Sequence, residues 1–393
     1  MLMVRAPLRV SFGGGGTDLA AYYARFGGFV LSAAITRYCR IMASEPVEWG
    51  IRIRSADYRT CAIFRSVGTP PVEEPLALPK AAIERFAGGP HPDPRPHTRE
   101  GALERGVDLA LASDVPPGSG LGSSSAMAVG LARALAAYVG LPLDAAGAAE
   151  LACWLEIERL GMPIGKQDQY ASAFGGLNAI DFTPDAVKVT PLDLRPEVTA
   201  ALSSRLLLFS TGRTRDSAEI LRQQRADTAD QPSVIRSLHG IKALARQMRE
   251  ALLAEDLDSF GELLHLGWRQ KKCLSRKISS TAIDRWYEAA RRAGALGGKI
   301  AGAGGGGFLL LYCPPQRQPA VRATLAGLGL RELAFGFDFG GARVLSRAEA
   351  GRGRGDRAGP AGFGQVVGAD RPRPGRDRRT WTGRAPRELA GQR

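Results

Sequence analysis

A loop rich in glycine and serine, residues 116–126, constrains the fold of this chain more than any other segment. It lies between the apolar run Val107–Ala112, which predicts a strand, and the alanine-rich run Ala126–Val139, which predicts a helix. Amides at a helix N-terminus have no partner within the helix, and glycines let a phosphate approach the backbone closely. The segment therefore predicts an anion site. The residues expected to hold the phosphates are Pro117, Gly118, Ser119, Gly120, Leu121, Gly122, Ser123 and Ser124.

Two well-known classes of phosphate loop do not match this segment. A Walker A loop needs a glycine, four residues and then Gly-Lys-Ser/Thr, and the nearest candidates, Gly161–Lys166 and Gly294–Lys299, have another spacing and no hydroxyl. A dinucleotide-binding loop is followed about 20 residues later by an acidic residue at the end of a second strand. Here Asp144 instead opens a predicted helix. The loop is therefore of a different kind.

Two further glycine clusters, residues 13–16 and 302–307, also lie beside predicted strands. Each alone could be an ordinary turn, but the three clusters together predict a cleft for a nucleotide and a substrate, built largely from backbone. The cluster at 302–307 contains no lysine or hydroxyl, so we expect it to shape the cleft wall by close backbone approach. Thr17 and Asp18, which end the first cluster, are short polar side chains suited to sugar hydroxyls.

Asp168 is the best candidate for a catalytic base. It follows Lys166 in a loop that begins at Gly165, and its carboxylate could accept the proton of a substrate hydroxyl during phosphoryl transfer. For an aspartate near a predicted helix start, an N-cap role is the alternative. Arg9, on the first predicted strand, could pair with Asp168, and a surface salt bridge is the competing interpretation of that arginine.

Glu156 is a candidate ligand of Mg2+, a cation that prefers oxygen donors such as carboxylates and the serine hydroxyls of the loop. It lies on the predicted helix Leu143–Leu160, on which Glu158 competes for the same role. A solvated helical face is the structural alternative for both glutamates.

The length of 393 residues allows two domains. Residues 1–190 mix predicted strands and helices, whereas residues 191–346 combine a long helical run with closing strands, which predicts a two-domain α+β fold. Residues 347–393 are rich in Arg, Gly and Pro, and we expect this tail to be disordered. Within it, residues 351–393 hold 11 arginines and 4 acidic residues, a net charge of +7 out of +14 for the whole chain.

The basic tail raises an alternative class of function, non-specific binding of nucleic acid or of a membrane surface. The rest of the chain lacks interleaved aromatic and basic residues, so we expect no specific nucleic-acid partner. It also lacks a long apolar run and a recognisable signal peptide, so we expect no membrane association. The five cysteines are far apart and the four histidines are scattered, which argues against a zinc site and favours a cytoplasmic location. A monomer and a homodimer both remain open.

The three glycine blocks, in this order, resemble the motifs of the GHMP kinase superfamily. Residues 116–126 resemble its ATP-binding motif, residues 6–18 its first motif and residues 299–307 its third. Within the superfamily, the stretches Ala6–Asp18 and Lys166–Tyr170 are similar to the D-glycero-D-manno-heptose 7-phosphate kinases. The segment Thr211–Ser217 is also similar to their C-terminal signature.

This resemblance implies a ribosomal-protein-S5-like N-terminal domain and a ferredoxin-like C-terminal domain, with ATP and Mg2+ bound between them. It implies transfer of the γ-phosphoryl group to the anomeric hydroxyl of a heptose 7-phosphate, which gives the 1,7-bisphosphate. Asp168 would then be the base, Arg9 its electrostatic partner, and Ser124 (or Ser123) and Glu156 the Mg2+ ligands. The residues expected to bind the sugar phosphate are Gly15, Gly16, Thr17, Asp18, Lys166, Gln169, Gly304 and Gly305.

One departure from the superfamily bears on the acceptor. Galactokinase-like members carry Gly-Glu-His before Thr-Asp, whereas this chain has three glycines, Gly14–Gly16, before Thr17. The loss of those side chains argues against galactose and makes room for a larger or phosphorylated sugar. For its phosphate, Lys166, Arg213 and Arg215 are candidates by charge. Another sugar-1-kinase, such as an L-fucose kinase, remains the related alternative.

Overall fold

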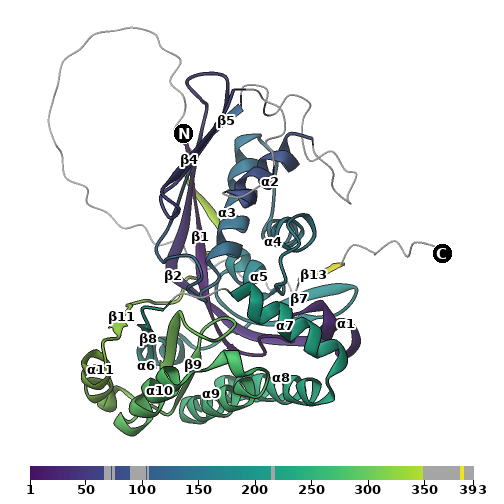
Figure 1. Cartoon of the computed structure of the whole chain (residues 1–393). Coiled ribbons are helices and arrows are strands. Elements are labelled where there is room, and N and C mark those ends of the chain that lie inside the picture. Colours follow the sequence, from purple (N-terminus) through teal and green to yellow (C-terminus); the bar gives the residue numbers. More distant parts are fainter. Residues whose placement is uncertain are drawn as a thin grey trace, which may run out of the picture.

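Two β-sheets with helices packed around them form the molecule (Figure 1). The computed structural model describes residues 1–65, 76–88, 106–213, 217–347 and 381–384, together with the single residues 72 and 103. The first sheet has nine strands and contains the long N-terminal strands, and the second has four strands, all from the C-terminal half.

The first sheet is centred on β1 (Leu2–Gly13) and β2 (Gly28–Ser44), which pair antiparallel along most of their length. The strand order across the sheet is β13-β7-β6-β2-β5-β3-β4, and β1 pairs with β2 outside this order. These strands are β3 (Gly50–Ser55), β4 (Thr60–Phe64), β5 (Gly106–Ser113), β6 (Leu177–Phe182), β7 (Ala186–Pro191) and β13 (Trp381–Arg384). The inner part of β1 is buried on both faces, because α3 (Ser123–Tyr138) and α8 (Pro232–Leu253) both contact it. This burial explains why apolar residues predominate there, although the buried stretch also contains Arg9 and Ser11.

The helix predicted at Ala126–Val139 exists as α3 and begins three residues earlier, inside the serine run. Its small residues let it lie close to the sheet: a Cβ at Gly130 would stand 2.2 Å from the Ile41 Cδ1 atom. The other helices of this part are α1 (Ala20–Phe26), α2 (Ala77–Phe86), α4 (Ala145–Cys153) and α5 (Gln167–Phe174). The predicted helix Leu143–Leu160 is α4 followed by a π-helical turn, Trp154–Arg159. Such turns often occur at functional sites, and this one carries Glu156.

The second sheet has the order β11-β8-β10-β9. Its strands are β8 (Leu206–Ser210), β9 (Gly297–Ile300), β10 (Phe308–Tyr312) and β11 (Arg331–Glu332). The long helical run predicted between residues 217 and 293 consists of α7 (Ser217–Asp230), α8, α9 (Leu257–Lys272) and α10 (Thr281–Ala293). Helices α6 (Pro196–Arg205) and α11 (Gln318–Gly327) flank the same sheet. None of the helices within the described ranges has the length and apolar character that crossing a membrane requires.

The chain returns to the first sheet at its end, which the sequence did not predict. β12 (Arg343–Arg347) pairs antiparallel with β1, with Leu2 opposite Arg347 and Val4 opposite Val344. Residues 343–346, assigned to the C-terminal domain by the sequence, therefore belong to the N-terminal sheet. Within the tail expected to be disordered, residue 347 is part of β12 and residues 381–384 form β13, which pairs with β7. The rest of the tail lies outside the described residues.

Candidate active site

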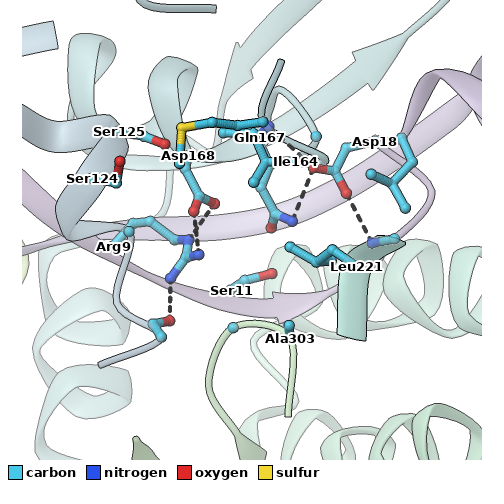
Figure 2. Close-up of a pocket in the computed structure, with 18 of the residues that line it drawn as sticks. Arg9, Ser11, Asp18, Ser124, Ser125, Ile164, Gln167, Asp168, Leu221 and Ala303 are labelled. Carbon is cyan, nitrogen blue, oxygen red and sulfur yellow. Dashed lines mark hydrogen bonds and ion pairs between the residues drawn. The ribbon is translucent and has the colours of Figure 1, made fainter. Parts of the chain in front are cut away.

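A cavity lies between the two parts of the chain and collects most of the residues singled out by the sequence (Figure 2). Its walls include the strands β1 and β9 and the helices α7 and α9. They also include the loop after β1, the glycine-serine loop and the loop that precedes α5. Eleven of the predicted site residues line it: Arg9, Gly15, Gly16, Asp18, Gly118, Gly120, Gly122, Ser123, Ser124, Glu156 and Asp168. In Figure 2, Arg9 and Asp168 lie between Ser124 and Ser125 on one side and Gln167 and Asp18 on the other.

Arg9 and Asp168 form a two-pronged ion pair at the middle of the cavity. The Arg9 Nε atom donates to Asp168 Oδ1 at 2.7 Å, and Arg9 Nη2 donates to Oδ2 at 2.5 Å. The third prong, Arg9 Nη1, donates to the carbonyl oxygen of Gly120 at 2.7 Å. Asp168 lies in the first turn of α5, and the N-cap residue is Lys166, so Asp168 pairs with the arginine rather than capping the helix. The pair fixes the orientation of the carboxylate and ties it to the glycine-serine loop.

The glycine-serine loop adopts a conformation that requires its glycines. Gly118, Gly120 and Gly122 have φ values of +73°, +81° and +75°, which other residues rarely adopt. A Cβ at Gly120 would lie 2.6 Å from the Ala301 carbonyl oxygen, and one at Gly302 would lie 2.6 Å from the Gly120 Cα atom. The third glycine cluster thus packs backbone to backbone against the loop, as predicted for a cleft wall. The loop delivers the chain to the N-terminus of α3, which has no side-chain cap, so its first amides can bind an anion.

Ser124, in the first turn of α3, and Glu156 are in contact beside this loop. The Ser124 hydroxyl donates to Glu156 Oε1 at 2.5 Å, and Gln169 Nε2 donates to Oε2 at 2.7 Å. Glu156 is completely buried, and burial, together with the charge of Asp168, raises its pKa to about 7 against the opposing hydrogen bonds. Glu158, the competing candidate, is exposed and does not line the cavity.

The Ser124–Glu156 pair fits a Mg2+ site by its chemistry. No cluster of three His, Cys, Asp or Glu side chains suited to a metal occurs in the part of the chain that the structure describes. Mg2+, however, is usually held by one or two protein oxygens, with substrate phosphates and water completing its shell. A hydroxyl and a carboxylate beside a loop whose amides can bind an anion would supply those protein oxygens.

Asp18 marks the other end of the cavity. Its Oδ1 atom accepts the Gly16 amide at 2.8 Å, and its Oδ2 atom accepts Gln167 Nε2 at 3.1 Å. Asp18 is buried, and this burial, aided by the charge of Asp168, raises its pKa. The carboxylate is thus held in place facing the cavity, where it can contact a bound substrate.

Several predicted substrate residues do not reach the cavity. Gln169 is fully buried beneath Glu156, which it holds, and it faces away from any substrate. The Thr17 hydroxyl lies 2.7 Å from the Gly14 oxygen and accepts the Phe29 amide at 3.0 Å, so it braces the first glycine cluster against β2. The Lys166 ammonium lies 5.7 Å from the centre of the Tyr23 ring, outside the cavity lining.

The remaining predicted residues outside the lining have structural contacts. Gly304 and Gly305 pack on Ile278: a Cβ at Gly304 would be 2.7 Å from its Cγ2 atom, and the Gly305 amide donates to its carbonyl at 2.6 Å. In the glycine-serine loop, Pro117, Ser119 and Leu121 do not line the cavity. Ser119 and Leu121 are buried, as expected for residues that alternate with the cavity-facing glycines.

Sequence reasoning missed other cavity residues, among them Ser11, Gln167, Gln224, Lys271 and Lys299. Lys299, on β9, donates from Nζ to the Ser11 carbonyl oxygen at 2.8 Å and so joins the second sheet to β1. Burial and the charge of Arg9 lower its pKa to about 7. Lys299 opens the third glycine block, so that motif contained a signal. Gln224, on α7, belongs to no motif.

Of the two arginines proposed for a sugar phosphate, the structure describes one. Arg213 is exposed, with its guanidinium 5.5 Å from the centre of the Trp286 ring, and it does not line the cavity. Arg215 lies outside the described residues.

Comparisons with known proteins identify the family of this chain. The GHMP kinases N terminal domain matches residues 81–176, and the GHMP kinases C terminal domain matches residues 248–328. The D-glycero-alpha-D-manno-heptose 7-phosphate kinase of Campylobacter jejuni is 32% identical over 318 residues, which are 81% of this chain and 91% of that protein. A solved D-glycero-D-manno-heptose 1-phosphate kinase from Bacteroides thetaiotaomicron superposes with a TM-score of 0.72 at 29% identity, covering 89% of this chain and 100% of that one.

The chain therefore belongs to the GHMP kinase family, and the expected two-domain α+β kinase fold is confirmed. It is an ATP-dependent phosphotransferase, and within the family it is a sugar kinase. A further relative is the bifunctional fucokinase/GDP-fucose pyrophosphorylase of Arabidopsis thaliana, 28% identical over 326 residues, which are 78% of this chain and 29% of that protein.

Proposed function

We propose that this sugar kinase transfers the γ-phosphoryl group of ATP to the anomeric hydroxyl of D-glycero-D-manno-heptose 7-phosphate, with Asp168 as the base. The observation that carries the proposal is the position of the Arg9–Asp168 pair, between an anion-binding loop and the buried carboxylate of Asp18. A carboxylate at that junction is within reach of both a phosphate on the loop and a hydroxyl at the opposite end.

In this proposal the acceptor oxygen forms a bond to the γ-phosphorus while the bond from that phosphorus to the β–γ bridging oxygen breaks. The proton of the acceptor hydroxyl passes to Asp168, and ADP leaves with the bridging oxygen. Arg9 holds both carboxylate oxygens at 2.5 and 2.7 Å, so the base is positioned before the substrate arrives.

The loop amides and the N-terminus of α3 would bind the phosphates of ATP. Ser124 and Glu156 would hold Mg2+, which when bound neutralises negative charge on those phosphates. Because Glu156 has a pKa of about 7, it must lose its proton to act as a ligand near neutral pH.

An assay of ADP release with heptose 7-phosphate, L-fucose, D-galactose and mevalonate tests the proposal. We expect the highest kcat/KM with heptose 7-phosphate, and phosphorus NMR of the product should show a new phosphate on the anomeric oxygen. No turnover of any sugar phosphate would refute the proposed acceptor.

L-Fucose is the second candidate acceptor. The lining cations among the described residues are Arg9, Lys271 and Lys299, and each already donates a hydrogen bond to a protein oxygen. An acceptor without a phosphate suits such a lining, and fucokinases are among the relatives. A cytoplasmic location, suggested by five cysteines that are all free, belongs to either version of the proposal.

A further inference from the structure

Three side chains at the Asp18 end of the cavity carry buried polar atoms without a hydrogen-bond partner. These atoms are Ser11 Oγ, Gln167 Oε1 and Gln224 Nε2. Ser11 is 5% exposed and Gln224 is 3% exposed. Buried polar groups in proteins are nearly always paired, so three unpaired atoms in one cavity wall call for an explanation.

The three side chains surround the backbone of Gly15 and Gly16. A Cβ at Gly15 would lie 3.5 Å from Gln167 Nε2 and 3.7 Å from Ser11 Oγ. A Cβ at Gly16 would lie 2.3 Å from Gln224 Nε2. Because glycine has no side chain, Gly15 and Gly16 leave room for these three side chains. Gln224 fills the volume that a side chain at position 16 would need.

Their chemistry points to hydroxyl groups. The serine hydroxyl can donate and accept, the free Gln167 oxygen accepts, and the free Gln224 nitrogen donates. None of the three is charged, and each comes from a different element: β1, α5 and α7. Other buried unpaired atoms, such as Ser32 Oγ and Trp268 Nε1, do not line the cavity, so the convergence is specific to this wall.

We propose that Ser11, Gln167 and Gln224 bind hydroxyl groups of a polyhydroxylated acceptor, and that Gln224 is a specificity-determining residue supplied by the second part of the chain. This rests on the proposed function, because it assumes that the acceptor occupies the Asp18 end of the cavity. A hydroxyl that satisfies these atoms is selected over an analogue without it, since the analogue leaves them buried and unpaired.

The decisive variant is Gln224→Met, which keeps the size of the side chain and removes its amide. We expect the KM for the acceptor to rise about tenfold, with the KM for ATP changed less than about twofold. Gln223→Met is the matched control: Gln223 is the neighbouring residue on α7, is exposed, and bonds Asp227 at 2.9 Å. It should leave both constants unchanged. An unchanged acceptor KM in Gln224→Met, or an equal rise for ATP, would overturn the proposal.

Acceptors lacking one hydroxyl sharpen the test. For one such monodeoxy sugar, the loss in kcat/KM seen with the wild type should disappear in Gln224→Met, because the contact is already gone. If, for every deoxy sugar, the loss in kcat/KM from the missing hydroxyl adds to the loss caused by Gln224→Met, then Gln224 contacts no hydroxyl. Ser11→Ala, which keeps the carbonyl bonded by Lys299, gives the same readout should Gln224→Met fail to fold.

The acceptor for these measurements is the member of the panel that the wild type turns over fastest. If that is L-fucose instead of heptose 7-phosphate, the proposed acceptor is wrong, while the comparison of Gln224→Met with Gln223→Met still tests the three side chains. If heptose 7-phosphate is turned over and Gln224→Met behaves as the wild type, only the present inference fails. Turnover of none of the four acceptors would refute both.

Discussion

The two ends of the cavity are built from different materials. The end proposed to bind the phosphates of ATP (the phosphate end) is mostly backbone from one continuous segment, the glycine-serine loop, with three glycines at positive φ and a helix N-terminus behind it. The Asp18 end is mostly side chains, and they come from four separate elements: β1, the loop after β1, α5 and α7.

This difference matches what each end would bind. Backbone amides suit a phosphate, which offers the same oxygens in every nucleotide, and they require only that glycine permit the conformation. Hydroxyl groups of a sugar differ between substrates in position and direction, so telling them apart needs side chains that donate and accept at fixed places. The two ends meet at Arg9 and Asp168.

Substitution at that meeting point should have the largest effect. We expect Asp168→Asn to lower kcat about 1000-fold, because the amide cannot accept the proton, while the affinity for ATP, measured by fluorescence or calorimetry, changes little. The exposed Asp185 provides a control, and Asp185→Asn should be silent. Turnover within tenfold of the wild type would remove Asp168 from the role of base.

A change confined to the phosphate end should be smaller and should affect ATP alone. Gly120 has a φ of +81°, and a Cβ added there would lie 2.6 Å from the Ala301 carbonyl oxygen. We therefore expect Gly120→Ala to raise the KM for ATP about 30-fold. Gly140→Ala is the matched control, since Gly140 has a φ of +76° with no atom within 4 Å of the added carbon. An equal rise in the acceptor KM would show that the two ends are not separable.

The phosphate end also carries an electrostatic cost that pH reveals. In the folded state the pKa of Glu156 is raised to about 7. The protonated carboxyl therefore stabilises the folded state at pH values below the unfolded-state pKa, and this stabilisation is lost as the pH rises through 7. Without Mg2+, Glu156→Gln should therefore be more stable than the wild type at pH 8, by about 3 kcal/mol, and no more stable at pH 4. Urea unfolding at both pH values measures this; an equal difference at both would contradict the assignment.

Removal of the tail should have the smallest effect, because β13, the part of the tail that the structure describes, pairs with β7, which does not line the cavity. Deleting residues 348–393 removes β13, which pairs with β7 at the sheet edge, and we expect kcat/KM for both substrates to stay within about twofold. A large loss of activity would contradict this, and loss of non-specific nucleic-acid binding on deletion would instead favour the alternative function of the basic tail.

The phosphate end could be predicted from the sequence because its signals are local. A glycine pattern between a strand and a helix fixes a backbone shape, so Gly118, Gly120, Gly122 and Ser124 were found without knowledge of the fold. The roles proposed for Asp168 and Glu156 needed the family resemblance as well, because a lone carboxylate on a helix has several ordinary explanations.

At the Asp18 end, Gly15, Gly16 and Asp18 were predicted, but the side chains around them could not be. Ser11 and Gln224 line the same cavity only because the fold brings α7 against the loop after β1, and no local pattern encodes that approach. The error at Gln169 has a simpler origin: on α5, consecutive residues point about 100° apart, so Asp168 faces the cavity while Gln169 faces the protein interior. Pairing of β12 with β1 is likewise a long-range event.

That pairing has a consequence for the order in which the protein folds. β1 is synthesised before β12, yet one of its edges is completed only by β12, more than 300 residues later. During synthesis the edge has unpaired backbone groups of the kind that template aggregation. The strand that positions Arg9 therefore acquires one of its two neighbouring strands only late in synthesis. Substitutions that weaken the pairing of β12 should consequently reduce the yield of folded enzyme before they alter its catalysis.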